Sequence, residues 1–366
     1  MGEYAPTNGS IDLPDSKSPS LILTNPTPEE RLETWNLNAA NWGTALPLPD
    51  YIERERYLTT VPLAKDGGIT HWVLVDRDLP PNERPILAAC ESLRKPVLVS
   101  KGGVIKEGIT HGIGSVFSQP KFRGRGYASR MLKELAPVLK TWQVNPNMPG
   151  HESCPFSILY SDIGTKYYAR FGWATFPSTH FAFPPADSPS RTDIRTLQYP
   201  DIPALCALDE QKLRKELTTA AKDGKTHVAL IKIFGKSPTI KGAIAGEPGS
   251  RVWAIWTRAF YGPLVPKSGN TLHILRLVIE DETESEENAQ KLKGILQFAQ
   301  AQAKEWQLNE VDVWNPSDTL KKLVKRTGVE NKYVVRDAER IASLMWYGEG
   351  STDDINWVAN EKFGWC

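Results

Sequence analysis

The chain has 366 residues, which is too long for one ordinary domain and long enough for two domains that each bury a core. Hydrophobic residues make up 40% and charged residues 24%, a composition typical of a globular protein rather than a disordered or fibrous one. The formal net charge of +1 creates no basic field, so we expect no nucleic-acid partner.

Cysteines and histidines are scattered singly along the chain, without the spacing of a disulfide framework or a zinc site. We therefore expect no metal, and we expect a reducing, cytoplasmic location. Residues 1–20 are polar and lack the pattern of a signal peptide, and no apolar stretch reaches membrane-spanning length. A flexible tail over 1–20 and no membrane association are predicted, whereas the sequence indicates no oligomeric state.

The first half of the chain predicts a sheet with helices packed on it. Thr27 has the features of an N-cap for a helix that runs through Trp35. Apolar, β-prone runs predict strands at residues 21–23, 71–75, 84–90, 96–100 and 109–117. In the last of these, alternation places Ile113, Ser115 and Phe117 on one face.

An amphipathic helix is predicted after that strand. Its inward positions recur at helical spacing and are Met131, Leu132, Leu135, Leu139 and Trp142. A buried strand at 156–160 and a short helix at 164–171 that stops at Gly172 follow. The element order is therefore strand, turn, helix, strand, helix.

The second half repeats this order after a proline- and serine-rich segment. Strands are expected at 251–256, 271–279 and 310–314, and helices at 287–306 and from the N-cap Ser317 to Thr327. We predict a first domain at 21–183, a linker at 184–190 and a second domain at 191–366.

The segment from Pro120 to Ala128 is the strongest chemical signal. Glycines between a strand and a helix let backbone N–H groups approach a phosphate, and the helix N-terminus adds partial positive charge. Positions Arg123, Gly124, Arg125, Gly126, Tyr127, Ala128 and Ser129 would supply these donors and two guanidinium groups. The spacing fits neither a Walker loop nor a Rossmann fingerprint, so the ligand is a different phosphate compound. The alternative is an ordinary glycine turn between surface arginines.

The second half carries an acidic run at 280–287 where the first half has this turn. Its charges would repel a pyrophosphate, so we expect a related fold that binds no cofactor. A solvated acidic loop is the simpler interpretation of the run, because its spacing is not that of a calcium loop.

Residues 121–126 resemble the Q/R-x-x-G-x-G/A loop of the GNAT N-acetyltransferases, with Lys121 in place of Gln or Arg. Residues 167–173 resemble the segment of that family with a tyrosine before a Gly-aromatic pair. The resemblance implies an α/β fold with an α+β mixed sheet: a GNAT domain in the N-terminal half and a degenerate GNAT-like second domain. It also implies acetyl-CoA as the donor.

The same resemblance assigns roles to particular residues. Backbone groups of Val116, Phe117 and Ser118 would pair with the pantetheine arm of the cofactor, and Tyr168 would protonate the leaving thiolate. Ser161 stands where many relatives have a cofactor-contacting Asn. Tyr168 has an alternative role as a core residue. Direct attack by an amine needs no covalent nucleophile, so Cys154, which lacks a histidine partner pattern, is expected to be inert.

A narrower resemblance, to the fungal lysine N6-acetyltransferase family, lies in residues 122–128, 161–164 and 360–366. It implies free L-lysine as the acceptor and a role in lysine degradation, and it leads us to expect a longer segment in relatives between His227 and Gly235. The mixed charges of residues 53–56 would suit the groups of lysine, or form a solvated surface. Open alternatives are another small amine, such as a polyamine or an aminoglycoside, a protein lysine, and a catalytically silent CoA-binding scaffold.

The chain ends with Trp357, Phe363 and Trp365 shortly before Cys366, which predicts a docked C-terminal segment. Its terminal carboxylate could serve the substrate amine as a base or cation partner, or the segment could simply pack into the core.

Overall fold

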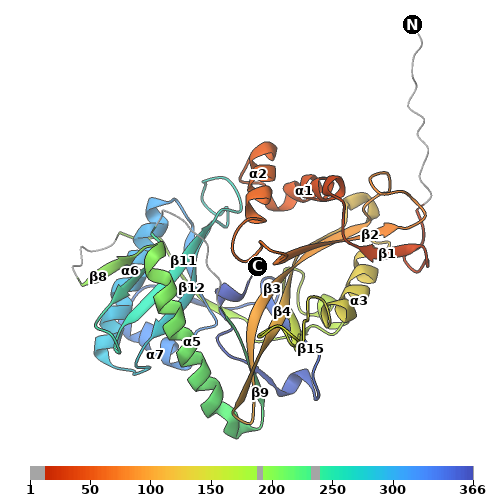
Figure 1. Cartoon of the computed structure of the whole chain (residues 1–366). Helices are drawn as coiled ribbons and strands as arrows, with labels where there is room; N and C mark the ends of the chain where they lie inside the picture. The colour runs from red at the N-terminus through yellow and green to blue at the C-terminus, as the bar shows by residue number, and fades with distance from the viewer. Residues whose placement is uncertain (1–12, 188–192, 232–239, 366) are drawn as a thin grey trace.

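The computed structural model describes residues 13–187, 193–231 and 240–365. In these residues two mixed β-sheets stand side by side, and helices cover both (Figure 1). Among the helices of this part of the chain, none is long and apolar enough to cross a membrane.

The first sheet contains nine strands among the described residues. These are β1 (Leu21–Thr24), β2 (Ile69–Asp76), β3 (Ala88–Lys101), β4 (Val104–Phe117), β5 (Phe156–Ser161), β6 (Ala174–Thr175), β9 (Thr226–Leu230), β15 (Ile341–Trp346) and β16 (Ile355–Trp357). The order is β1-β2-β3-β4-β5-β15-β6, and β9 pairs with β3 and β16. The strands expected at 84–90 and 96–100 are parts of one long strand, β3, which begins only at Ala88.

The second sheet contains seven strands among the described residues. These are β7 (Thr179–Phe183), β8 (Ile194–Leu197), β10 (Gly242–Ala245), β11 (Val252–Ala259), β12 (Thr271–Ile279), β13 (Glu310–Trp314) and β14 (Lys332–Val335). Their order is β14-β7-β13-β12-β11-β10-β8. In each sheet one βαβ unit pairs two strands in parallel, β4 with β5 and β12 with β13.

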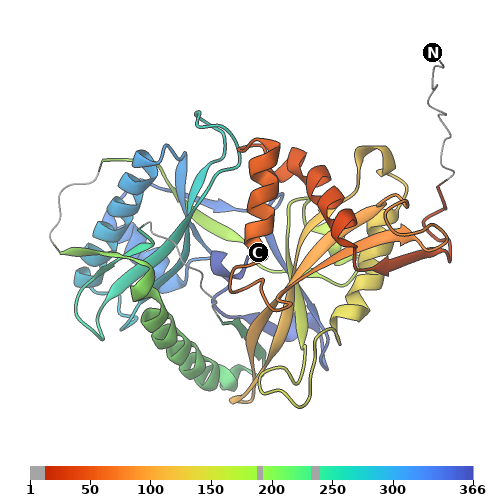
Figure 2. The ribbon, with the colours of Figure 1, turned by 45° about the horizontal axis from the view of Figure 1, so that its top comes forward.

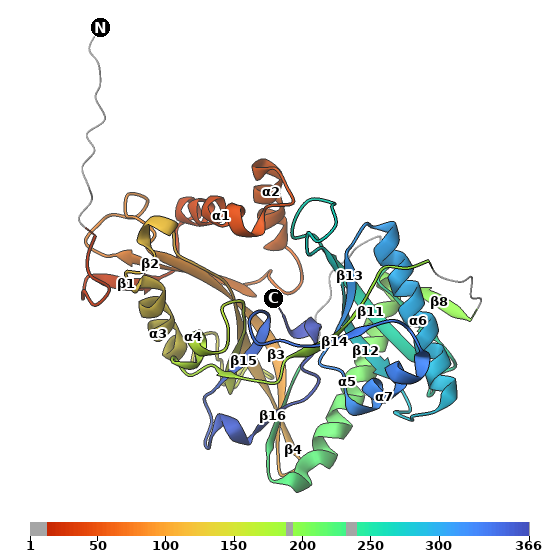
Figure 3. The ribbon, with the colours of Figure 1, turned by 180° about the vertical axis from the view of Figure 1, so that it is seen from behind.

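The α-helices are α1 (Pro28–Trp42), α2 (Leu48–Leu58), α3 (Tyr127–Leu139), α4 (Lys166–Ala169), α5 (Ile202–Thr219), α6 (Glu286–Glu305) and α7 (Asp318–Thr327). Short 3₁₀ turns lie at Pro120–Phe122, Tyr199–Asp201, Ala220–Asp223, Thr352–Asp354 and Lys362–Gly364. Helices α1 and α2 cover one face of the first sheet and α3 covers the other (Figures 1 and 3).

Local sequence signals explain where the helices of the first half begin and what they bury. Thr27 caps α1: its side chain accepts the Glu30 N–H at 3.1 Å, and the Glu30 carboxylate accepts the Thr27 N–H at 3.0 Å. Helix α3 buries the expected inward face, with Met131, Leu132 and Leu135 fully inaccessible to solvent. The N-cap at Thr27 is confirmed, and so is the inward face of α3 up to Leu139, where the helix ends; Trp142 lies in the turn after it.

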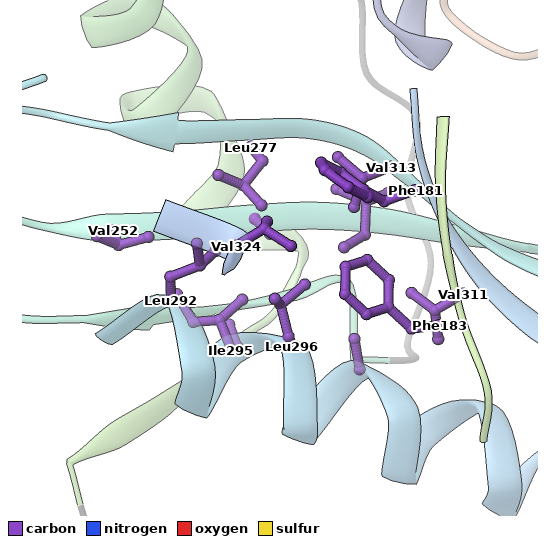
Figure 4. Close-up of a cluster of buried hydrophobic side chains, with 14 of the residues drawn as sticks. Phe181, Phe183, Val252, Leu277, Leu292, Ile295, Leu296, Val311, Val313 and Val324 are labelled. Atoms are coloured by element: carbon purple, nitrogen blue, oxygen red, sulfur yellow. The ribbon is translucent and has the colours of Figure 1, made fainter. Parts of the chain in front are cut away.

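The second half has its own core between α6 and the second sheet (Figure 4). Leu292, Ile295 and Leu296 of α6 are 0% exposed, as their helical spacing predicts. They meet alternate residues of the strands, among them Val311 and Val313. The repeated element order is thus a repeated packing scheme of helix on mixed sheet.

The two sheets exchange strands across the segment expected to be a linker. Strand β7 lies before that segment but pairs with β13 in the second sheet, whereas β15 lies far after it and pairs with β5 in the first sheet. The chain therefore crosses between the sheets more than once. The division at 184–190 stays a prediction about folding units, and the strand pairing itself crosses it in both directions.

The C-terminal segment lies between the two sheets (Figure 2). Trp357 is 7% exposed, and Phe363 and Trp365 pack against the same apolar cluster as Tyr160 of β5. The expected docking of this segment is confirmed up to Trp365. Cys366 lies outside the described residues. So do residues 232–235, which belong to the segment expected to be longer in relatives.

Candidate functional site

Strands β4 and β5 stop pairing with each other at the place where the sequence predicts cofactor binding. Their parallel pairing ends at Ile113 and Leu159, although β4 continues to Phe117 and β5 to Ser161. The facing edges of the two strand ends are therefore not paired with each other. Backbone N–H and C=O groups along such an opening can hydrogen-bond an extended polar ligand.

A β-bulge in β4 lies at this opening. Ala89 of β3 pairs with Phe117 and Glu91 pairs with Gly114, so β4 has one more residue than β3 between the two pairs. Ser115 takes up the distortion with a φ of 52°. The expectation that Ile113, Ser115 and Phe117 share a face is wrong, because the extra residue reverses the alternation.

The reversal decides which side chains face which helix. Ile113 and Val116 pack with the core under α3, whereas Phe117 contacts Trp42 of α1 on the opposite face, with ring centroids 6.1 Å apart. The hydroxyl of Ser118 has no hydrogen-bond partner among the described residues. Residues 116–118, where the pantetheine contact is predicted, follow the last residue of β4 that pairs with β5.

The glycine turn opens directly into α3. Gly124 and Gly126 have φ values of 78° and 87°, which favour glycine, and Gly126 is the N-cap, so no side chain caps the helix. The N–H of Arg130 donates to the carbonyl of Gly126 at 2.9 Å, which leaves the N–H groups of the first turn without a helical acceptor. The geometry is that of an anion-binding helix N-terminus.

Residues from three segments surround this turn. Arg123 and Arg125 are exposed, and Nε of Arg123 donates to the carbonyl of Ser118 at 3.1 Å. A third guanidinium, which sequence reasoning missed, comes from Arg170 after α4: it donates to Ser129 Oγ at 2.9 Å. Tyr127 is buried and its hydroxyl donates to the carbonyl of Pro14 at 2.6 Å. The fold therefore brings the guanidinium of Arg170 to the glycine turn, although no sequence motif predicted it.

Tyr168 lies on α4 and is 9% exposed, in the core that includes Cys90 and Trp173. Burial raises the pKa of Tyr168 above its ordinary value, so the phenol keeps its proton at neutral pH. Ser161 is 1% exposed, and its hydroxyl donates to the carbonyl of Gly164 at 2.7 Å. Its proton therefore holds the turn after β5 in this structure.

Cys154 is 5% exposed, and burial raises the pKa of its thiol to about 12. A thiol with that pKa is protonated at neutral pH and is a poor nucleophile.

Glu91 of β3 is the functional candidate that the sequence did not single out. Its carboxylate accepts the hydroxyl of Ser115 at 2.8 Å, so it lies directly at the bulge. Burial raises the pKa of Glu91 to about 7, and the charge of Glu55 on α2 acts in the same direction while Arg54 opposes it. His71 of β2, whose Nε2 lies 3.7 Å from the carboxylate, is neutral at pH 7 because burial lowers its pKa to about 4.

The mixed-charge run on α2 divides into two pairs. Glu53 and Arg56 are exposed, with 75% and 57% of their side chains accessible. Glu55 is only 14% accessible and pairs with Arg54 at 2.7 Å. Glu53 and Arg56 are therefore solvated surface, whereas the charges of Arg54 and Glu55 act on Glu91.

At the matching opening in the second sheet, the C-terminal segment contacts β12. Strands β12 and β13 pair only as far as Ile274 and Val313. Beyond that point the carboxylate of Glu361 accepts the N–H of Leu277 at 3.2 Å and pairs with Arg276, which Asp209 also holds at 2.8 Å. A ligand could therefore pair with this part of β12 only if Glu361 moved away from Leu277.

Among the described residues, no group of three or more His, Cys, Asp or Glu side chains is arranged to hold a metal ion. The site therefore consists of a strand opening, a bulge, an uncapped helix N-terminus and buried titratable groups. A fold with such an opening between two parallel strands, followed by a glycine turn, defines a GNAT-type acyltransferase.

Comparison with known proteins agrees with this class. The family description "LYC1 GNAT-like C-terminal domain" matches residues 180–232 and 231–366, about half of the chain. The chain belongs to this family, and the predicted resemblance to GNAT proteins, together with the predicted fold class, is confirmed.

One curated relative and two solved structures are informative. "Lysine acetyltransferase" of Yarrowia lipolytica is 31% identical over 182 residues, which are 46% of this chain and 44% of that protein, so the likeness spans less than half of the relative. A GCN5-related N-acetyltransferase from Anabaena variabilis superposes with a TM-score of 0.52 at 14% identity, covering 88% of this chain and 72% of that one. N-myristoyltransferase of Saccharomyces cerevisiae, solved with bound myristoyl-CoA, gives a TM-score of 0.53 at 10% identity, covering 95% and 86%. At these identities the two structures show the fold alone.

Proposed function

We propose that this chain transfers the acetyl group of acetyl-CoA to the side-chain amine of free L-lysine. The observation that carries the proposal is the meeting of three features at one place: the opening between β4 and β5, the bulge at Ser115, and the uncapped N-terminus of α3. An extended CoA molecule needs a strand edge for its pantetheine arm and a cluster of N–H donors for its diphosphate. The relative named lysine acetyltransferase supports a lysine amine as the acceptor.

The proposed cofactor contacts follow the geometry. The backbone of Val116, Phe117 and Ser118 would pair with the pantetheine arm. The N–H groups of 124–129 and the guanidinium groups of Arg123, Arg125 and Arg170 would hold the phosphates. When bound, acetyl-CoA supplies the thioester that is attacked.

Two residues of the chain would move protons. A lysine side chain is an ammonium at neutral pH and must lose a proton before its nitrogen can attack. Glu91, with a pKa of about 7, would accept that proton as a general base. As the new N–C bond forms and the C–S bond breaks, Tyr168 would protonate the departing thiolate. Burial raises the pKa of Glu91 most, the Ser115 hydroxyl and Arg54 lower it, and Glu55 raises it further.

Mass spectrometry of a mixed pool of amines and amino acids, incubated with the protein and acetyl-CoA, tests the proposal. The expected product is lysine that has gained one acetyl group on its side chain, and Tyr168→Phe should form it more slowly. An acetylated polyamine, aminoglycoside or protein lysine would replace the proposed acceptor. No product at all, with acetyl-CoA still bound, would favour a silent scaffold.

A place in lysine degradation and a cytoplasmic location are part of the same proposal. Acetylation of the side chain removes its charge and blocks its nucleophilic nitrogen, a suitable first step before the rest of lysine is oxidised. Cys90 and Cys154 are buried cysteines that form no disulfide, which suits a reducing compartment.

A further inference from the structure

The second sheet carries polar residues on the face that meets the first sheet. Strand β13 alternates: Val311 and Val313 pack under α6, and Asp312 and Trp314 point to the other side. His273 of β12, the register partner of Asp312, behaves in the same way. Both polar side chains are 0% exposed. This face is therefore a buried polar surface and not a solvated one.

Three cations gather around Asp312, and together they are called the cationic cluster: Arg336 and Arg340 after β14, and Lys362 in the C-terminal segment. Arg340 lies 3.7 Å from the Asp312 carboxylate. The guanidinium carbon of Arg336 lies 3.8 Å from the ring centroid of Trp314. The cluster thus places one buried and two half-buried basic side chains beside one buried carboxylate.

Most of the hydrogen-bonding capacity of Arg336 and Lys362 is unused within the described residues. All three side-chain nitrogens of Arg336 are buried without a hydrogen-bond partner among the described residues. The same holds for Nζ of Lys362, a residue that is 4% exposed. Lys362 lies between two stacked indoles, 4.5 Å from the centroid of Trp314 and 2.6 Å from that of Trp365. Buried cations without partners are costly, and an anion that joined them would regain hydrogen bonds and charge pairing.

The cluster lies next to the proposed acyl-transfer site. Tyr160 immediately precedes Ser161 in the end of β5 that no longer pairs with β4, and its ring lies 6.0 Å from Trp314 and 6.4 Å from Trp365. The next residue after β5, Asp162, accepts the N–H of Arg340 at 3.1 Å, and its charge acts on both Tyr168 and Lys362. One short segment therefore links the thiolate-protonating tyrosine to the cationic cluster.

We propose that Arg336 and Lys362, with Arg340 beside them, bind the carboxylate of an amino-acid acceptor whose side-chain amine reaches the opening between β4 and β5. This assignment rests on the proposed acetyl transfer and deepens it, because it makes the carboxylate the group that separates amino acids from plain diamines. Guanidinium is suited to the role by its planar, two-pronged match to a carboxylate. Since the nitrogens are covered in this structure, the C-terminal segment must shift when the acceptor enters.

Steady-state kinetics with three acceptors tests the subsite. Lysine carries the carboxylate and both amines, 6-aminohexanoate lacks the α-amine, and cadaverine lacks the carboxylate. Arg336→Gln should raise KM for lysine and 6-aminohexanoate about ten- to hundredfold, the loss expected for a charge-assisted hydrogen bond, and should leave cadaverine unchanged. Arg336→Lys should recover part of the loss. The matched control Arg326→Gln removes an exposed guanidinium on α7 and should change none of the three.

An unchanged KM for lysine, or an equal rise for cadaverine, would overturn the subsite while leaving acetyl transfer intact. If no amine is acetylated, the proposed function fails by itself. The subsite is then judged by calorimetry with lysine and by hydrogen exchange of residues 355–365. Lysine binding that protects this segment in the wild type but not in Arg336→Gln or Lys362→Met supports the subsite, and absence of lysine binding to the wild type overturns it.

Discussion

Replacing Glu91 by glutamine tests the central electrostatic claim through stability as well as rate. Burial raises the pKa of Glu91 from 4.5 to about 7 in the folded chain. Below pH 4.5 the group is protonated in both states and contributes no difference. As pH rises from 4.5 to 7, the unfolded chain releases this proton while the folded chain retains it, so stability falls across that window.

The size of the effect follows from the shift. The rise in the pKa of Glu91 from 4.5 to about 7 corresponds to at most about 3 kcal/mol of folding free energy, and this stability is fully lost above pH 7. Glu91→Gln removes the ionisable group and keeps an acceptor for the Ser115 hydroxyl. The variant should therefore equal the wild type near pH 4 and be more stable by up to about 3 kcal/mol at pH 8.

Urea unfolding at several pH values between 4 and 8 measures the difference, with Glu53→Gln as the control because that side chain is 75% accessible. The control should follow the wild type within about 0.5 kcal/mol. In the same samples, Glu91→Gln should lower kcat/KM for the amine about a hundredfold or more at pH 8. A stability difference that does not vary with pH would refute the raised pKa. Full activity with the expected stability change would remove Glu91 from the proton transfer alone.

Three further changes test other parts of the structure. Gly126→Ala should raise KM for acetyl-CoA about tenfold, because its φ is 87° and the new methyl would lie 2.9 Å from Ser16 Oγ; Gly328→Ala, at a φ of 66° with open space around it, controls for backbone strain. Tyr168→Phe should reduce kcat about a hundredfold with an unchanged Kd for acetyl-CoA by calorimetry, and an equal loss in both would indicate a packing role. Leu296→Ala should destabilise the second half by about 2–5 kcal/mol in thermal or urea unfolding, since the side chain is 0% exposed; a loss below 1 kcal/mol would contradict its place in the core.

Helix starts, buried helix faces and the glycine turn could be predicted from the sequence. Thr27 predicts the start of α1, the spacing from Met131 onward predicts the buried face of α3, and Gly124 with Gly126 predicts the uncapped turn. Each depends on residues a few positions apart, whose interactions are decided by helix geometry and by the conformations that glycine permits. The repeated element order was readable for the same reason.

The active-site details depend on contacts between distant segments. The bulge at Ser115 arises because β4 has one more residue than β3 between two neighbouring pairs, and the sequence of neither strand alone reveals it. Glu91 becomes a candidate base only because that bulge, α2 and His71 enclose it. Alternation in β13 shows that Asp312 and Val313 face opposite ways, but it cannot tell whether the polar face meets water.

The exchange of strands between the two sheets decides whether the polar face of β13 meets water. Pairing β15 with β5 and β7 with β13 brings the two sheets together, and the C-terminal segment packs between them. The sequence by itself determined the helices, the glycine turn and the class of cofactor, because these depend on near neighbours. Tertiary structure alone decided which polar groups lose contact with water, and the cost of burying those groups is what makes Glu91 and the cationic cluster candidates for function.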